Sequence, residues 1–143
     1  DPHAAQRVLT AGWPLTLVGL DVTHRCVLTQ EHMDRIEAGQ GALGKVLAES
    51  YTFYSDFYRE FLGIDGCCPH DSCALAWLLR PELFTTAPGH LAVITEGSAE
   101  GQTIFAPEGR GFIQERWSQT PLVEVCLEAD GQAVVEWIAE TLS

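Results

Sequence analysis

Residues 63–79 read GIDGCCPHDSCALAWLL, and this stretch decides how the chain around it must fold. Its glycines and Pro69 forbid a helix that runs straight through. After Pro69 the sequence becomes mostly apolar, which is typical of a buried helix. His70 and Asp71 therefore fall in the first turn of that helix, where unpaired backbone N–H groups and the helix dipole favour an anion. An equally simple interpretation is that Asp71 only caps the helix and His70 is its surface neighbour.

Helical and strand patterns alternate along the rest of the chain. Asp1 and Pro2 are residue types favoured at the start of a helix. The run LTLVGL at residues 15–20 is typical of a strand that is buried on both faces of a parallel sheet. This alternation predicts an α/β fold with a mostly parallel open sheet flanked by helices, in a single unit of residues 1–143. Helices are expected at residues 2–11, 30–38, 42–62, 70–79 and 131–142, and strands at residues 15–20, 90–95, 102–105 and 122–127.

Polar residues follow the first predicted strand directly. Asp21, Thr23 and His24 stand at its carboxyl end, which is the edge where open α/β sheets bind ligands. The simpler interpretation is a turn that is tied by hydrogen bonds of the Asp21 and Thr23 side chains. No catalytic role is assigned to these residues.

The composition restricts the class of protein and its partners. The chain has 143 residues, 46% of them hydrophobic and 20% charged, as expected of a soluble globular protein with its own core. Its net charge of −12 argues against nucleic acid or an anionic membrane as a partner, because clustered Lys and Arg bind phosphate groups. No apolar run approaches the ~18–20 residues that span a bilayer. An odd number of cysteines is interpreted as reduced thiols of a cytoplasmic protein: Cys26, Cys67, Cys68, Cys73 and Cys126.

A series of motifs resembles a known enzyme family. In order they are GLDVTH at residues 19–24, the aromatic run FYSDFY at residues 53–58, Gly66 followed by His70-Asp71, and RPELF at residues 80–84. Together they resemble the C-terminal half of the inosine-uridine-preferring nucleoside hydrolase family, over the part of the chain up to about Thr103. The resemblance implies an enzyme that splits the N-glycosidic bond of purine or pyrimidine ribonucleosides into base and ribose.

The same resemblance implies roles for individual residues. Asp71 matches a ligand of the family's bound Ca²⁺, which holds the attacking water and the ribose hydroxyls. His70 matches the position that touches or protonates the leaving base, and it is the predicted catalytic residue. Tyr54 or Tyr58 would face the nucleobase, where ring stacking is worth ~1–3 kcal/mol. An aromatic stripe of this kind also suits an ordinary helix core.

Parts of the family pattern are missing from the sequence. The Asp-Thr-Asp-Pro-Gly-x-Asp-Asp motif, which supplies the general base and most calcium carboxylates, is absent, and so is the Glu-x-Asn pair that binds ribose hydroxyls. We therefore expect the chain to be a C-terminal fragment that is inactive alone, although the intact enzyme would be active. Lost sheet neighbours would leave an apolar face liable to self-association, and a homo-oligomer is expected.

Other interpretations stay open. A zinc or redox site could use His70 and the nearby cysteines, although adjacent cysteines do not easily reach one tetrahedral ion and no second ligand pair follows. Cys67 or Cys73 beside His70 could form a nucleophilic thiolate pair. The chain could also be a non-catalytic interaction module on a scaffold derived from a hydrolase.

Overall fold

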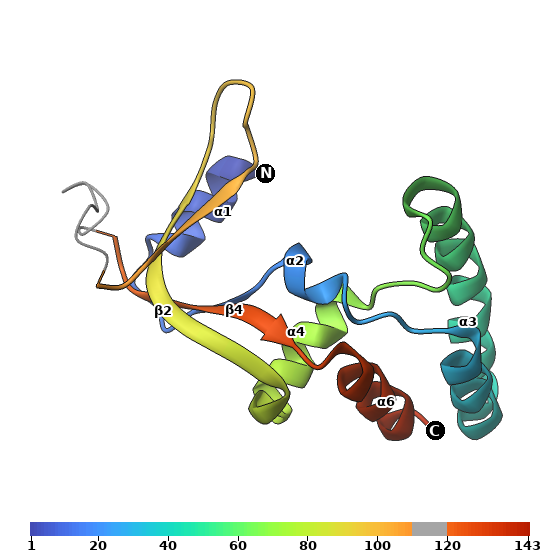
Figure 1. Cartoon of the computed structure of the whole chain (residues 1–143). Helices are drawn as coiled ribbons and strands as arrows, with labels where there is room; N and C mark the ends of the chain where they lie inside the picture. Colours follow the sequence, from blue (N-terminus) through green and yellow to red (C-terminus); the bar gives the residue numbers. More distant parts are fainter. Residues whose placement is uncertain (110–119) are drawn as a thin grey trace. The chain divides into compact units, whose positions relative to one another are not determined.

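The computed structural model describes residues 1–109 and 120–143 and shows an α/β fold with a mixed sheet flanked by helices (Figure 1). The sheet has four strands in the order β1 (Thr16–Val18), β4 (Val123–Ala129), β2 (Phe84–Val93) and β3 (Thr103–Pro107). Strands β2 and β3 are antiparallel, with Gly89 opposite Pro107 and Val93 opposite Thr103. The predicted α/β class is therefore confirmed, and the β2–β3 pair makes the sheet mixed where the sequence predicted a mostly parallel one.

The chain divides into two compact units, each built from two separate segments. The first unit comprises residues 1–17 and 86–126, and the second comprises residues 18–85 and 127–143. The single α/β unit expected for residues 1–143 stays a prediction. In the described part of the chain, no helix combines the length and the apolar character that crossing a bilayer requires.

The first unit contains helix α1 (Pro2–Leu9), strand β3, most of β2 and the first part of β4. The Asp1 side chain caps α1 by accepting a hydrogen bond from the backbone N–H of Ala4 at 2.9 Å, as the sequence predicts. The side-chain oxygen of Gln6 accepts from the backbone N–H of Val93 at 2.7 Å and so ties α1 to β2. The buried core of this unit contains Leu9, Leu91, Val93, Val123 and Val125.

The second unit holds the remaining helices of the described part of the chain. They are α2 (Leu20–Thr23), α3 (Gln30–Leu62), α4 (His70–Leu79), the 3-10 turn η1 (Pro81–Leu83) and α6 (Gly131–Thr141). Helices α4 and α6 pack on each other, and α3 packs on α6. Asp130 caps α6, because its side chain accepts a hydrogen bond from the backbone N–H of Ala133 at 3.1 Å. The fully buried side chains of the core include Cys26, Ile36, Cys73, Ala76 and Val134.

Helix α3 bends at the glycines where the sequence predicts a break. Gly41 has φ 56° and ψ −120°, which is not helical, so two helical segments meet there. Gly63 ends the second segment in the left-handed conformation with φ 66°. The predicted break and the predicted end of this helix are both confirmed.

The strands differ from the prediction at their ends. The first strand stops at Val18, and the next residues form the single turn of α2 instead of extending the strand. Strand β2 starts at Phe84, although Pro88 and Gly89 are typical of a turn. Gly89 suits this strand because a Cβ atom there would lie 2.5 Å from the carbonyl oxygen of Ala106 on β3. The sequence of residues 107–111, PEGRG, predicts a turn, and this segment lies partly outside the described residues.

Candidate functional site

His70 is the first residue of α4, and both of its ring nitrogens are engaged. The Thr23 hydroxyl at the end of α2 lies 2.6 Å from Nδ1. The Tyr58 hydroxyl, from the second segment of α3, lies 2.6 Å from Nε2. The His24 ring meets the His70 ring edge-on, with 5.5 Å between the ring centroids. Three helices of the second unit therefore converge on one imidazole.

The loop before α4 holds His70 in this position. Leu28 and Cys67 exchange backbone hydrogen bonds of 2.8 and 3.0 Å, which anchor the loop to the segment before α3. Gly66 has φ 138°, and a Cβ atom there would lie 2.5 Å from the carbonyl oxygen of Leu28. Only glycine fits this close approach of two backbones. Pro69 then starts the helix, so the sequence places His70 in the first turn as predicted.

Burial favours the uncharged forms of His70 and Tyr58. Loss of solvent lowers the pKa of His70 below its usual 6.5, the nearby His24 lowers it further, and Asp71 opposes both effects. Burial raises the pKa of the Tyr58 hydroxyl above its usual 10. At neutral pH the site is thus a neutral imidazole between two neutral hydroxyl groups. Because a neutral imidazole has one N–H and one acceptor nitrogen, one hydroxyl donates to the ring and the other accepts from it.

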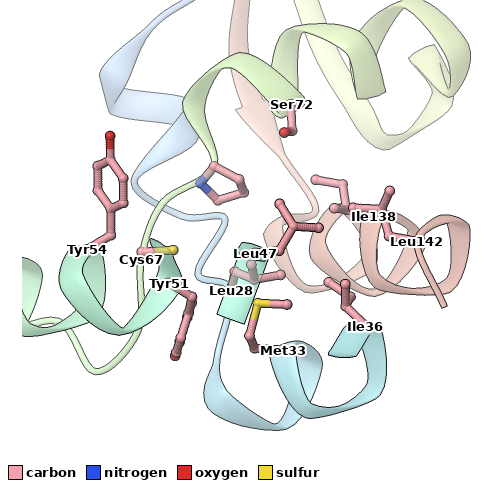
Figure 2. Close-up of a pocket in the computed structure, with 11 residues that line it drawn as sticks. Leu28, Met33, Ile36, Leu47, Tyr51, Tyr54, Cys67, Ser72, Ile138 and Leu142 are labelled. Carbon is pink, nitrogen blue, oxygen red and sulfur yellow. The ribbon is translucent and has the colours of Figure 1, made fainter. Parts of the chain in front are cut away.

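The two predicted tyrosines differ in their surroundings. Tyr58 is buried, with 7% of its surface exposed, and bonds to His70, whereas Tyr54 is 56% exposed. Tyr54 borders an apolar pocket of about 190 Å³ (Figure 2). Figure 2 shows the apolar side chains of Met33 and Ile36 gathered in this pocket. His70 is not among the residues that line this pocket, and of the two tyrosines it is Tyr58 that bonds to the imidazole.

The aromatic stripe of α3 divides between core and surface. Tyr51 and Tyr58 face the interior of the second unit. Phe53, Phe57 and Phe61 are 47–73% exposed. The core interpretation therefore holds for one side of the helix, and the other side is apolar surface.

Asp71 carries an exposed carboxylate in the first turn of α4. Among residues 1–109 and 120–143, no group of three or more His, Cys, Asp or Glu side chains is placed to hold a metal ion. Calcium is usually bound by six to eight oxygen atoms, several of them from carboxylates. The donors of the described chain therefore do not complete a Ca²⁺ site, and Asp71 is suited at most to contribute one ligand.

The cysteines near His70 lack the properties of a reactive pair. Burial raises the pKa of Cys67 to about 11, with a further contribution from Cys68. Cys73 has none of its surface exposed, and its contact with Cys26 and its burial raise its pKa. A nucleophilic thiolate needs the opposite shift. The structure thus gives no support to the thiolate interpretation.

Sequence reasoning did not assign Thr23 a place beside His70. The available signal was its position just after the first strand, at the edge where ligands bind in α/β sheets. The same position also predicts a turn, because a threonine at a strand end usually bonds to nearby backbone. Thr23 instead is 1% exposed and bonds to His70, 47 residues away in the chain.

Comparisons with known proteins agree on one family. The model of the family described as inosine-uridine preferring nucleoside hydrolase matches residues 1–136. Pyrimidine-specific ribonucleoside hydrolase RihA of Citrobacter koseri is 34% identical over all of this chain and 45% of its own length. RihA of Escherichia coli strain HS is 33% identical over 99% of this chain and 44% of its own length.

Solved structures show the same relationship. A plant nucleoside hydrolase, the PpNRh1 enzyme, matches 99% of this chain and 45% of its own, with a TM-score of 0.89 and 28% identity. A purine-preferring ribonucleoside hydrolase from Gardnerella vaginalis matches 99% of this chain and 43% of its own, with a TM-score of 0.81 and 28% identity. The chain thus spans less than half the length of these relatives.

Proposed function

Because this chain belongs to the inosine-uridine preferring nucleoside hydrolase family, as its C-terminal portion, we propose that the enzyme containing it hydrolyses ribonucleosides to base and ribose. The chain spans 45% of the Citrobacter koseri relative, so the activity is proposed for the whole enzyme and the chain alone is proposed to be inactive. The observation that carries the proposal is the hydrogen-bonded series Thr23–His70–Tyr58, which can supply a proton to a leaving base.

The two hydrogen bonds of His70 support one path for that proton. In hydrolysis, a water oxygen bonds to the anomeric carbon, the carbon–nitrogen bond breaks, and the departing base must gain a proton. In its imidazolium form, His70 donates through Nδ1 to Thr23 and through Nε2 to Tyr58. Tyr58 can then give its O–H proton to the base while it takes the Nε2 proton, and this leaves His70 neutral. Because its pKa is lowered, the imidazolium is a minor form at neutral pH but a stronger acid than an ordinary imidazolium when it forms.

The tyrosines supply different contacts to the base in this proposal. Tyr58 is buried and reaches the substrate through its hydroxyl group. Tyr54, which is 56% exposed, offers its ring face for stacking, a contact of ~1–3 kcal/mol. His70 acts behind Tyr58, and it is the residue whose protonation state controls the transfer.

We also propose that Asp71 contributes one oxygen ligand to a Ca²⁺ ion in the whole enzyme. A bound Ca²⁺ would hold the attacking water and the ribose hydroxyls. The exposed carboxylate on the first turn of α4 supports this role. The remaining ligands would come from the portion of the enzyme that this chain does not match.

The wider setting is proposed on bulk properties. We propose a cytoplasmic homo-oligomer that binds neither nucleic acid nor membrane. The net charge of −12 supports the absence of nucleic-acid and membrane partners, because anionic surfaces repel an acidic protein. The unpaired thiols of Cys26, Cys67 and Cys73 support a reducing compartment.

The test is base release by the whole enzyme from a panel of purine and pyrimidine ribonucleosides. We expect release of base and ribose, and we expect His70→Ala to lower kcat by roughly 10²–10⁴-fold, the usual contribution of a general acid. The matched control is His3→Ala, since His3 is exposed and makes none of the contacts of His70. An unchanged kcat in the His70 variant would show that the leaving-group role is wrong. Failure of the unaltered whole enzyme to release any base would overturn the proposal itself.

A further inference from the structure

The hydroxyl groups of Thr23 and Tyr58 share a single partner, the imidazole of His70. Thr23 Oγ1 lies 2.6 Å from Nδ1, and the Tyr58 hydroxyl oxygen lies 2.6 Å from Nε2. Neither hydroxyl has another hydrogen-bond partner among the described residues. These groups therefore form a closed set whose protons can be counted.

In its neutral form this set has three protons for two hydrogen bonds. Each hydroxyl carries one proton, and the neutral imidazole carries one on either of its nitrogens. Two of the three protons lie in the two bonds, and the third points away. If Tyr58 donates to Nε2, the ring donates from Nδ1 and the Thr23 proton is left over. If Thr23 donates to Nδ1, the ring donates from Nε2 and the Tyr58 proton is left over.

The surroundings of Thr23 favour the second arrangement. Thr23 is 1% exposed, and a buried O–H group without an acceptor is destabilising. A helical threonine can donate to the carbonyl four residues before it. Here that carbonyl, of Gly19, already accepts from the backbone N–H groups of Val22 and Thr23, at 3.1 and 3.0 Å. A phenol is the stronger donor of the two hydroxyls, but Tyr58 is 7% exposed and can direct its proton out of the interior, whereas Thr23 cannot.

We propose that Thr23 is a positioning residue that fixes the tautomer of His70. Its hydroxyl donates to Nδ1, the neutral ring keeps its proton on Nε2, and the O–H of Tyr58 points outward. The consequence for catalysis rests on the proposed function: the Tyr58 proton is directed to the leaving base before the bond breaks. There it meets an acceptor atom of the base, a ring nitrogen or a carbonyl oxygen.

The same orientation persists when His70 takes up a proton from water. That proton enters at Nδ1, the ring nitrogen that has none, and the Thr23 hydroxyl turns to accept from it. The Nε2–H group donates to Tyr58 before and after this step, so the Tyr58 proton stays directed outward. Thr23 thus acts on the reaction through His70 and Tyr58, without touching the substrate.

The tautomer is measured at neutral pH on this chain with ¹⁵N-labelled histidine. Two-bond ¹H–¹⁵N correlation spectra distinguish a protonated ring nitrogen from an acceptor nitrogen, and the signals lost in His70→Gln identify His70. We expect the Nε2–H tautomer in the parent and in Thr23→Ser, which keeps the hydroxyl. Thr23→Val, which removes the donor at nearly the same size, should give a mixture of tautomers. The Nδ1–H tautomer in the parent, or a mixture there, would overturn the proposal.

Kinetics of the whole enzyme test the positioning role. Thr23→Val should lower kcat on ribonucleosides by at least ~10-fold, a part of the ~10²–10⁴-fold that a general acid contributes, and Thr23→Ser should restore most of it. With para-nitrophenyl riboside, whose leaving phenolate needs no proton, we expect the loss in Thr23→Val to disappear. An equal loss with both substrates would mean that Thr23 serves only the fold, and the positioning role would be wrong.

The two measurements separate this inference from the proposed function. If the unaltered whole enzyme releases no base, the proposed function is wrong, and the spectra still decide where the Thr23 proton lies. If base is released but the parent carries its proton on Nδ1, the inference fails and the proposed function stands. The spectra of the parent and of Thr23→Ser decide even where Thr23→Val does not fold, and they are recorded on the whole enzyme if this chain alone does not fold.

Discussion

His70 illustrates how one residue type acquires a defined role from its surroundings. Its imidazole is a neutral group whose two nitrogens are each 2.6 Å from a hydroxyl oxygen. Two short bonds from separate helices fix the orientation of the ring. Because of these two bonds, His70 acts on a substrate atom either through Tyr58 or after one of the bonds breaks. A relay through Tyr58 is the simpler consequence.

Tyr58→Phe tests the structural role of the Tyr58–His70 bond by removing one oxygen atom. We expect the free energy of unfolding to fall by about 1 kcal/mol, because a hydrogen bond is lost and Nε2 of His70 is left without its partner. Urea unfolding of this chain measures the effect. Tyr54→Phe is the matched control, one helical turn away and 56% exposed, and it should change stability by less than about 0.5 kcal/mol. Equal losses in the two variants would contradict a structural role of the Tyr58–His70 bond.

The lowered pKa of His70 predicts how stability depends on pH. Between the lowered folded pKa and the usual 6.5, the unfolded chain binds more protons at this position than the folded chain. Stability from His70 is therefore fully present above pH 6.5 and is lost as the pH falls through the folded pKa. The expected result is a steeper acid loss of stability in the parent chain than in His70→Gln, measured by urea unfolding at a series of pH values. Parallel pH curves for the two proteins would show that the prediction is wrong.

At the scale of the element, the bend in α3 depends on a backbone conformation. Gly41 has φ 56° and ψ −120°, and a Cβ atom there would meet nothing within 4 Å. A methyl group would therefore fit, but residues other than glycine disfavour this combination of φ and ψ. We expect Gly41→Ala to destabilise the chain by about 1–3 kcal/mol through backbone strain. Gln40→Ala, at the residue before the bend, is the control for an alanine introduced next to the non-helical position.

The outcome for Gly41 is read from chemical unfolding together with helix content. If Gly41→Ala instead stabilises the chain, the two segments of α3 can join as one straight helix, and the bend is not required by the packing. A loss of stability in Gln40→Ala as large as in Gly41→Ala would point to a local packing effect rather than to the backbone.

Local chemistry explains which elements could be predicted from the sequence. The caps at Asp1 and Asp130, the bend at Gly41 and the start of α4 at His70 all depend on residues within a few positions of one another. The full length of β2 could not be predicted in this way. Its Pro88-Gly89 pair stays extended because β3 pairs with it, and that pairing is not local.

The same distinction holds for the candidate site. That His70 and Asp71 share a helix start follows from Pro69 and the apolar run after it. That Thr23 contacts His70 does not follow, because a one-turn helix 47 residues earlier supplies the hydroxyl. The choice of Tyr58 over Tyr54 depends on how α3 is rotated against α4, which helical spacing alone leaves open.

At the scale of the whole molecule, the chain carries features that a larger protein would complete. The second unit exposes apolar side chains on α3 and α4. Its one carboxylate at the head of α4, Asp71, has no described group of potential metal ligands around it. Both features have a common explanation if the remaining portion of the family fold supplies apolar cover and further oxygen ligands together.

Calcium binding tests whether the rest of the enzyme completes the metal site at Asp71. Because one carboxylate supplies too few of the six to eight oxygens that Ca²⁺ prefers, we expect isothermal titration of this chain alone to give only weak binding, with a Kd of about 1 mM or above. We expect the whole enzyme to bind at least roughly 100-fold more tightly, and Asp71→Ala to remove that gain. Glu49→Gln, which neutralises another exposed carboxylate on α3, is the control and should leave the affinity unchanged. Tight binding by this chain alone would mean that ligands beyond Asp71 gather within it, and an unaltered affinity in the Asp71 variant of the whole enzyme would remove Asp71 from the metal site.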